Sequence, residues 1–139
     1  MLVFVLIVMV GVLVLYVCKM IEHFPSECID PYLRQQIKEK GLVHYTNHES
    51  AKEIIAEQEL KSKKIPTSII ERDLIWMMTN EPSVRKEQIK LVKKWKKSRD
   101  TIIYISGITD EQIDEMRIRR EKKNNLLITV VCEKSLKAQ

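Results

Sequence analysis

The sequence predicts an α/β or α+β protein, in which an N-terminal transmembrane helix precedes one small domain of about four strands and four helices. The first observation is that residues 1–18 contain no charged side chain, whereas the rest of the chain holds all 24 Lys and Arg and all 19 Asp and Glu. The second is that helix and strand patterns alternate from residue 30 onward, over a length that suits one domain. Three Gly and three Cys exclude a collagen and a disulfide scaffold.

The opening segment has the length and composition of a membrane anchor. Residues 1–18 are apolar apart from Tyr16, and as a helix they would reach roughly 27 Å, close to the thickness of the hydrocarbon core. A cleaved signal peptide needs a basic start and small residues before the cut, and neither is present. We therefore expect a single-pass anchor at 1–19 that contacts the bilayer, a juxtamembrane linker at 20–29 and a domain at 30–139.

The charges near this segment predict its orientation. No basic residue precedes it, and the first basic residues after it are Lys19, Arg34, Lys38 and Lys40. The positive-inside rule then places the protein in the cell membrane with the C-terminal domain in the cytoplasm. A reducing compartment also suits Cys18, Cys28 and Cys132, which have no metal-ligand spacing and are expected to be free thiols.

Local signals predict the first half of the domain. Asp30 followed by Pro31 is typical of a helix start, and Gly41 ends that helix. Residues 42–45 read as a short strand. Thr46 and Glu49 have the spacing of a capping box, which predicts a second helix that runs to about residue 58.

The second half continues the alternation. Residues 59–73 are expected to be mostly loop, residues 74–78 a buried strand and residues 83–98 a helix with Leu91, Val92 and Trp95 on its apolar side. Residues 101–105 form a β-branched strand, Thr109 and Gln112 cap a fourth helix that ends near residue 125, and residues 126–132 form the last strand. The helices at 83–98 and 109–125 could each cross between parallel strands, which leaves a doubly wound sheet and a split mixed sheet open.

The order of residues and predicted elements in one part of the chain is similar to that of a known protein family. Residues 42–60, LVHYTNHESAKEIIAEQEL, have a strand that delivers a His, a Thr that caps the next helix, and a helix with Ala and Ile inward; LIWMMTNE follows at 74–81. Over residues 41–81 this order resembles the opening of the ADP-ribosyltransferase fold, including small prophage and toxin relatives in which an H-x-T begins the domain. The resemblance implies NAD as a possible ligand, although nothing in the sequence requires a cofactor.

The resemblance also implies roles for individual residues. His44 would bond the nicotinamide-side ribose, with Tyr45 beside it and Thr46 supporting the turn, and Trp76 would stack on the nicotinamide. Glu133 is the nearest candidate for the catalytic carboxylate because it closes the last strand. Tyr45 stands where some members have Gly, and no Glu on a late strand is an obvious match, so an inactive or repurposed version stays open.

The same residues also have structural explanations. His44 could be a half-buried strand residue, Thr46 a helix cap and Trp76 a core residue. His44 and His48 are four apart, but the break from strand to helix between them spoils the geometry of a metal pair, and no HExxH occurs. No metal site is therefore expected.

A basic segment is the second functional feature. Between residues 85 and 99, eight basic residues stand against Glu87 alone: Arg85, Lys86, Lys90, Lys93, Lys94, Lys96, Lys97 and Arg99. They could form a solvated helix face, contact anionic lipid head groups or attract an acidic protein, with nucleic acid less favoured. A second basic group at residues 117–123 is explained by the end of the predicted fourth helix.

Two functions from different classes follow. The first is a membrane-anchored module that binds NAD or another nucleotide in a toxin, phage or defence setting. The alternative is a non-catalytic interaction protein, such as an immunity or exclusion factor, whose basic helices dock an acidic partner or anionic lipid.

Overall fold

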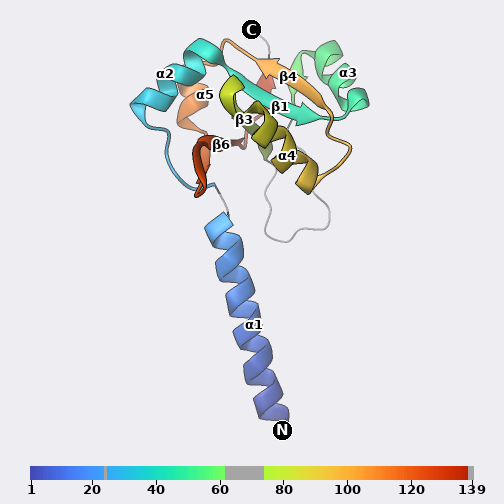
Figure 1. Cartoon of the computed structure of the whole chain (residues 1–139), viewed down its shortest axis with the longest axis vertical. Coiled ribbons are helices and arrows are strands. Elements are labelled where there is room, and N and C mark those ends of the chain that lie inside the picture. The colour runs from blue at the N-terminus through green and yellow to red at the C-terminus, as the bar shows by residue number, and fades with distance from the viewer. Residues whose placement is uncertain (24, 62–73, 138–139) are drawn as a thin grey trace.

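The N-terminal helix stands apart from the rest of the molecule. The computed structural model describes residues 1–23, 25–61 and 74–137. Helix α1 (Leu2–His23) includes an 18-residue stretch, Leu2–Lys19, with a mean hydropathy of 2.8 and no residue buried. Figure 1 shows α1 projecting from the domain. By length and composition α1 is apolar enough to span a membrane, as the sequence predicted.

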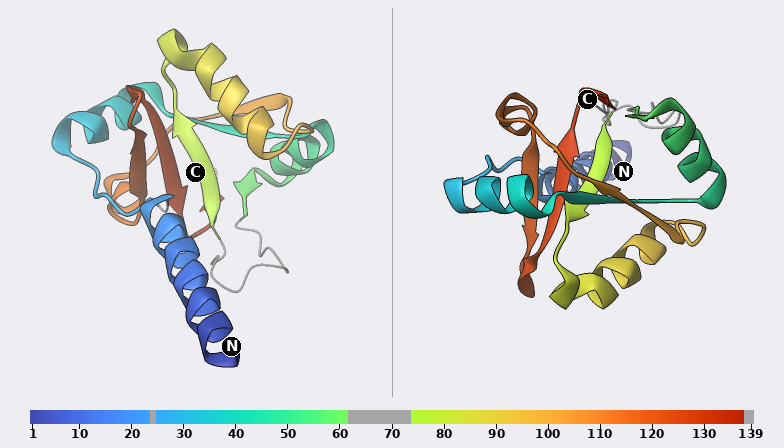
Figure 2. Two further views of the ribbon diagram at one scale, coloured as in Figure 1. Left: turned by 60° about the horizontal axis from the view of Figure 1, so that its bottom comes forward. Right: turned by 90° about the horizontal axis from the view of Figure 1, so that it is seen from above.

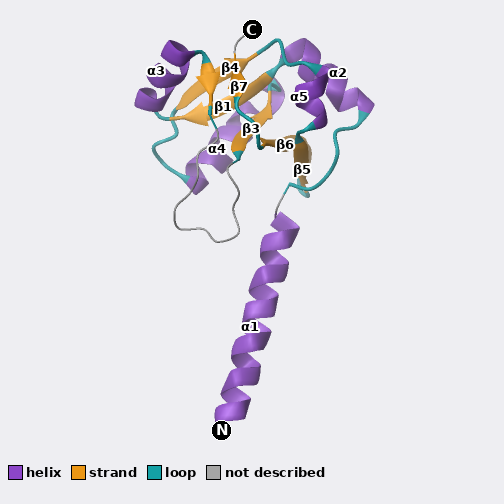
Figure 3. Ribbon diagram, turned by 180° about the vertical axis from the view of Figure 1, so that it is seen from behind, coloured by secondary structure: helices purple, strands orange, loops and turns teal. Residues whose placement is uncertain are grey.

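The remaining elements form an α+β domain. The helices are α2 (Pro31–Lys40), α3 (His48–Glu57), the 3-10 helix η1 (Pro82–Val84), α4 (Arg85–Trp95) and α5 (Asp110–Asp114). The strands are β1 (Leu42–Thr46), β2 (Glu59–Leu60), β3 (Ile75–Thr79), β4 (Thr101–Ile105), β5 (Arg117–Glu121), β6 (Asn124–Cys132) and β7 (Leu136–Lys137). Figure 3 shows the strands together between the helices.

Five strands form one sheet in the order β4-β1-β3-β6-β5, and β2 pairs with β7 in a second sheet. Every strand pairing in the described part of the chain is antiparallel. The domain is therefore α+β, and neither of the two helices expected to cross between parallel strands does so.

The five-stranded sheet has an apolar core on each face. One core joins Ile37 of α2 and Ile113 of α5 to the sheet residues Leu42 and Val130. The other includes Val92 of α4 and its sheet neighbours. The right-hand view of Figure 2 shows α4 on one face of the sheet and α3 and α5 on the other. Alternating strand residues therefore enter different cores.

Several local predictions are confirmed. Asp30 caps α2 by accepting a hydrogen bond from the Leu33 backbone N–H at 2.8 Å. Gly41 ends that helix with a φ of 76°, a conformation that favours glycine. Strand β4 has the predicted bounds, and Thr109 with Gln112 forms the predicted capping box of α5.

Two helix predictions need small corrections. The capping box at Thr46 is wrong: Asn47 is the cap of α3, accepting from the Ser50 backbone N–H at 2.7 Å, and Thr46 pairs with Thr101 as the last residue of β1. The predicted helix 83–98 is shorter, because η1 precedes α4 and α4 ends at Trp95. On the apolar side of α4, Val92 is buried, whereas Trp95 is 46% exposed.

The structure describes only residues 59–61 of the predicted loop at 59–73. Its first two residues form β2, and residues 62–73 lie outside the described part of the chain.

The predicted fourth helix is wrong beyond its first turns. Helix α5 ends at Asp114, and β5 follows, with Ile118 fully buried. Because β5 pairs with β6, the second basic group lies on a β-hairpin and not at a helix end. The helix dipole therefore does not explain these basic residues.

The predicted linker is attached to the sheet. Glu27 and Ile118 form an isolated antiparallel bridge, in which each backbone N–H donates to the other residue's carbonyl, at 3.1 and 2.9 Å. Pro25 is buried. The end of α1 is thus connected to β5 through a short stretch of chain.

Candidate functional site

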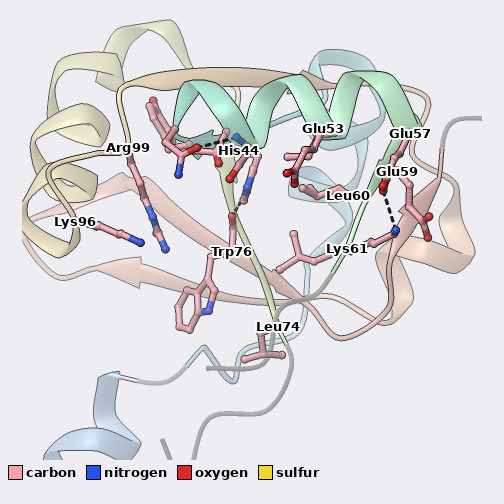
Figure 4. Close-up of a pocket in the computed structure, with 16 residues that line it drawn as sticks. His44, Glu53, Glu57, Glu59, Leu60, Lys61, Leu74, Trp76, Lys96 and Arg99 are labelled. Carbon is pink, nitrogen blue, oxygen red and sulfur yellow. Dashed lines mark hydrogen bonds and ion pairs between the residues drawn. The ribbon is translucent and has the colours of Figure 1, made fainter. Parts of the chain in front are cut away.

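A pocket opens where the central strands separate. Strands β1 and β3 pair at only two positions, Leu42 with Thr79 and Val43 with Met78. Beyond these pairs β1 stays bonded to β4, and β3 to β6. A cavity of about 230 Å³ lies at the separation, lined by parts of β1, α3, β2, β3 and the segment after α4. Figure 4 shows its side chains.

His44 bridges the two strands at this pocket. Its Nδ1 lies 2.8 Å from the backbone carbonyl oxygen of Trp76. Because a carbonyl can only accept, Nδ1 must carry the hydrogen of this bond. The side chain is half-buried and lines the pocket. His44 is therefore the half-buried strand residue that the sequence allowed, and its side chain also lines a cavity.

Tyr45 and Thr46 also line the pocket, but the side chain of Tyr45 is used elsewhere. Tyr45 is 5% exposed and belongs to the core under α4. Its hydroxyl donates to Oε1 of Gln88 at 2.8 Å, and Gln88 in turn donates to the Thr79 carbonyl at 2.7 Å. Thr46 is buried. The hydroxyl of Tyr45 is thus engaged within the fold.

Trp76 contributes its backbone to His44 and its ring to another contact. The Trp76 ring meets the Trp95 ring edge-on, with centroids 6.2 Å apart and planes at 66°. In Figure 4 the Trp76 ring points away from His44. The predicted stacking residue therefore lines the pocket, but its ring lies on the other side of its own backbone from His44.

Glu133 lies outside the pocket lining, exposed after the end of β6. Three other carboxylates, which the sequence did not single out, line the pocket: Glu53, Glu57 and Glu59. Glu57 is 2.7 Å from Lys61, and this hydrogen bond raises the pKa of Lys61. Glu53 and Glu57 are four residues apart on one face of α3, and this spacing is the sequence signal that could have identified these two carboxylates.

The basic segment is divided between three roles. Lys96 and Arg99 line the pocket on the side of His44 away from the carboxylates, as Figure 4 shows. Arg85 is half-buried and donates to Asn80 at 2.6 Å and to Gln88 at 2.9 Å. The other members are exposed: Lys86, Lys90, Lys93, Lys94 and Lys97. Arg85 is therefore part of the fold, and the sequence did not predict a pocket role for Lys96 and Arg99.

The pocket has an uneven charge. One end carries carboxylates, the other carries cations, and the imidazole ring of His44 lies between them. Such a site can hold a ligand with an anionic group at the Lys96 and Arg99 end and hydroxyls near His44. Among the described residues, no group of three or more His, Cys, Asp or Glu is arranged to hold a metal ion.

Comparison of the chain with protein-family models, with curated proteins and with solved structures finds no match.

Proposed function

We propose that the chain is a single-pass membrane protein whose cytoplasmic domain binds NAD or a related nucleotide in the pocket at His44. The observation that carries the ligand proposal is the position of His44 between the separated strands, with its Nδ1 bonded to the Trp76 carbonyl. The resemblance of residues 42–60 to an ADP-ribosyltransferase opening supports the choice of ligand class. The apolar helix α1 supports the membrane anchor.

The pocket suits one end of a dinucleotide. Its volume, about 230 Å³, lies below the range of roughly 300–1,000 Å³ for sites that enclose a drug-sized ligand. We therefore propose that a nucleoside part enters beside His44 and that the phosphates lie near Lys96 and Arg99. Guanidinium and ammonium groups are the usual partners of phosphate oxygens.

The proposal is one of binding and not of catalysis. Glu133, the carboxylate that the resemblance favours, is not part of the pocket lining. A carboxylate that stabilises a charged transition state must lie close to the reacting atoms. We therefore propose a ligand-binding module that retains the nucleotide site of the family it resembles.

The test is calorimetric titration of NAD into the full chain in detergent micelles. Native protein should bind saturably and His44→Ala should not, because the substitution removes the ring that faces the ligand. His48→Ala is the matched control, since His48 is an exposed residue of α3 that does not line the pocket. Far-UV circular dichroism checks that His44→Ala is folded. Absence of binding by folded native protein, or native-like binding by His44→Ala, would refute the proposal.

The charge pattern of the pocket gives a second arm to this test. Lys96→Glu with Arg99→Glu should weaken NAD binding at least tenfold, because two cations next to the phosphates become anions. Lys86→Glu with Lys90→Glu changes the net charge equally on the exposed surface of α4 and should leave binding within about twofold. Equal losses in the two double variants would indicate a general charge effect and no phosphate site.

The proposed orientation has its own test. Cys28 is a free, exposed thiol in the segment between α1 and the domain. In intact cells that express the chain, a membrane-impermeant maleimide should leave Cys28 unlabelled until the cells are permeabilised. Labelling of Cys28 before permeabilisation would place the domain on the outer side.

A second candidate function is favoured by the exposed lysines of α4. A non-catalytic interaction protein would dock an acidic protein on Lys93, Lys94 and Lys97, which lie outside the pocket lining. Reversing these three charges should then remove activity in cells while NAD binding persists, and His44→Ala should be nearly silent. Loss of activity in His44→Ala alone would favour the nucleotide function.

A further inference from the structure

The β5–β6 hairpin lies next to the point where α1 leaves the domain. The two backbone hydrogen bonds between Glu27 and Ile118 hold the chain after α1 against β5. Pro25, between them and the helix, is buried. Figures 1 and 3 show the turn of the hairpin on the side of the domain from which α1 projects. The hairpin is therefore kept near the end of α1 by bonds within the fold.

This hairpin is strongly basic. Its basic residues, against Glu121, are Arg117, Arg119, Arg120, Lys122 and Lys123. Arg120 is engaged with Asp30 at 2.5 Å, and Arg119 lies 3.9 Å from Glu121. Lys122 and Lys123 are exposed at the turn, and neither has an ion-pair partner in the described part of the chain. The turn thus presents two exposed cations.

The end of α4 lies on the same side of the domain. Lys93 and Lys94, in its last turn, are exposed, and Figure 1 shows this end of α4 at about the height of the hairpin turn along the axis of α1. Both basic groups therefore lie on the side of the domain from which α1 projects. Basic residues directly next to a membrane segment are attracted to anionic head groups within about a Debye length of the surface.

We propose that Lys122 and Lys123, at the turn of the β5–β6 hairpin, contact anionic lipid head groups and hold the domain against the membrane surface. The inference rests on the proposed membrane anchor and goes beyond it, because an anchor alone would leave the domain free to tilt. The charge complementarity between the turn and an anionic leaflet, together with the attachment of β5 to the end of α1, selects lipid as the occupant. With the hairpin on the surface, the basic end of α4 is lowered toward the same leaflet.

The test uses the full chain in vesicles of phosphatidylcholine, and in vesicles with about one third phosphatidylserine. A membrane-impermeant amine reagent is added, and acylation of each lysine is followed by peptide mass spectrometry. Lys122 and Lys123 should react several-fold more slowly in the anionic vesicles, and high salt should remove the difference. Lys52, exposed on α3 away from the exit of α1, should react equally in both.

Charge-reversal variants give an independent readout at Cys28. In native protein, thiol labelling of this exposed cysteine should be slower in the anionic vesicles, because the domain covers it. Lys122→Glu with Lys123→Glu should restore the rate seen in phosphatidylcholine, whereas the matched control Lys86→Glu with Lys90→Glu should keep the protection.

The outcomes separate this inference from the proposed anchor. Loss of the chain from carbonate-washed vesicles would overturn the anchor and the hairpin contact together. Retention of the chain with equal lysine rates in both kinds of vesicle would overturn the hairpin contact alone. Protection of Cys28 that survives the hairpin reversal would also overturn it.

Discussion

Gly41→Ala should be among the most damaging small substitutions in the domain. Gly41 joins α2 to β1 with a φ of 76° and a ψ of −166°, a region that only glycine adopts readily. A Cβ added there would lie 2.1 Å from the backbone carbonyl oxygen of Ile105. Since Leu42, the next residue, pairs with Ile105, the contact can be relieved only by moving β4 away from β1.

The magnitude follows from these two effects. Backbone strain at such a position costs about 1–3 kcal/mol. Displacing β4 at its last pair would also lose the net value of a hydrogen bond, about 1 kcal/mol. We expect Gly41→Ala to lower the free energy of unfolding by about 3 kcal/mol, a large part of the 5–15 kcal/mol typical of a native domain.

The assay is urea unfolding of the full chain in detergent micelles, followed by tryptophan fluorescence. The two tryptophans of the chain, Trp76 and Trp95, contact each other in the folded domain. Gly107→Ala is the matched control, because Gly107 has a φ of 67° but no atom within 4 Å of the added Cβ. It should cost about 1 kcal/mol from strain alone. If Gly41→Ala costs no more than Gly107→Ala, the reasoning from the Ile105 contact is refuted.

Two further predictions concern titratable groups. Cys132 is 2% exposed, and burial raises the pKa of its thiol. Iodoacetamide should therefore modify the exposed Cys28 in native protein and Cys132 only after unfolding. Comparable rates for the two thiols in native protein would contradict the burial of Cys132. A hydrogen bond from Lys38, and a weaker effect of the hydrogen bond from Arg34, lower the pKa of Asp110 in the folded state. The ionised Asp110 carboxylate therefore stabilises the fold above its unfolded pKa, and this stabilisation is lost as the pH falls through its folded pKa. Asp110→Asn should therefore lower the thermal midpoint near neutral pH, with the difference from native protein shrinking below about pH 4; a difference independent of pH would refute this account.

Elements encoded by neighbouring residues could be predicted from the sequence. The Asp30 cap with its proline and Gly41, and the Thr109 capping box, each depend on side chains within a few positions of the bonds that they make. The predicted start of α3 was one residue too early, because Thr46 and Asn47 are both residue types that can cap a helix. Pairing with Thr101, a distant residue, is what assigns Thr46 to the strand.

Strand β5 shows the opposite case. A basic segment after a capped helix start looks like the end of that helix, but Ile118, between Arg117 and Arg119, is fully buried in a strand. The decisive interaction is the ladder with β6, which includes Ile118 opposite Val130. Residues 117–121 hold one apolar residue and no period of two residues, so this strand has no local signal in the sequence.

The candidate site was predicted in part. His44 and Thr46 were expected in one place because they are close in sequence, and both line the pocket. Lys96 and Arg99 come to the pocket from the segment after α4, a placement that depends on tertiary packing and has no local signal. The direction of the Trp76 ring likewise depends on which face of the sheet each strand residue occupies.

The separation of β1 from β3 has a thermodynamic consequence. Besides the apolar cores that they share, the β4–β1 half of the sheet is joined to the β3–β6–β5 half by two residue pairs and by the hydrogen bond of His44 to Trp76. Any molecule that fills the gap would bridge the two halves, and its binding would be linked to folding: stability rises with the logarithm of the ligand concentration once it exceeds Kd. Because of this separation between β1 and β3, a rise in the thermal melting temperature of the native chain directly reports a compound that binds in the cavity.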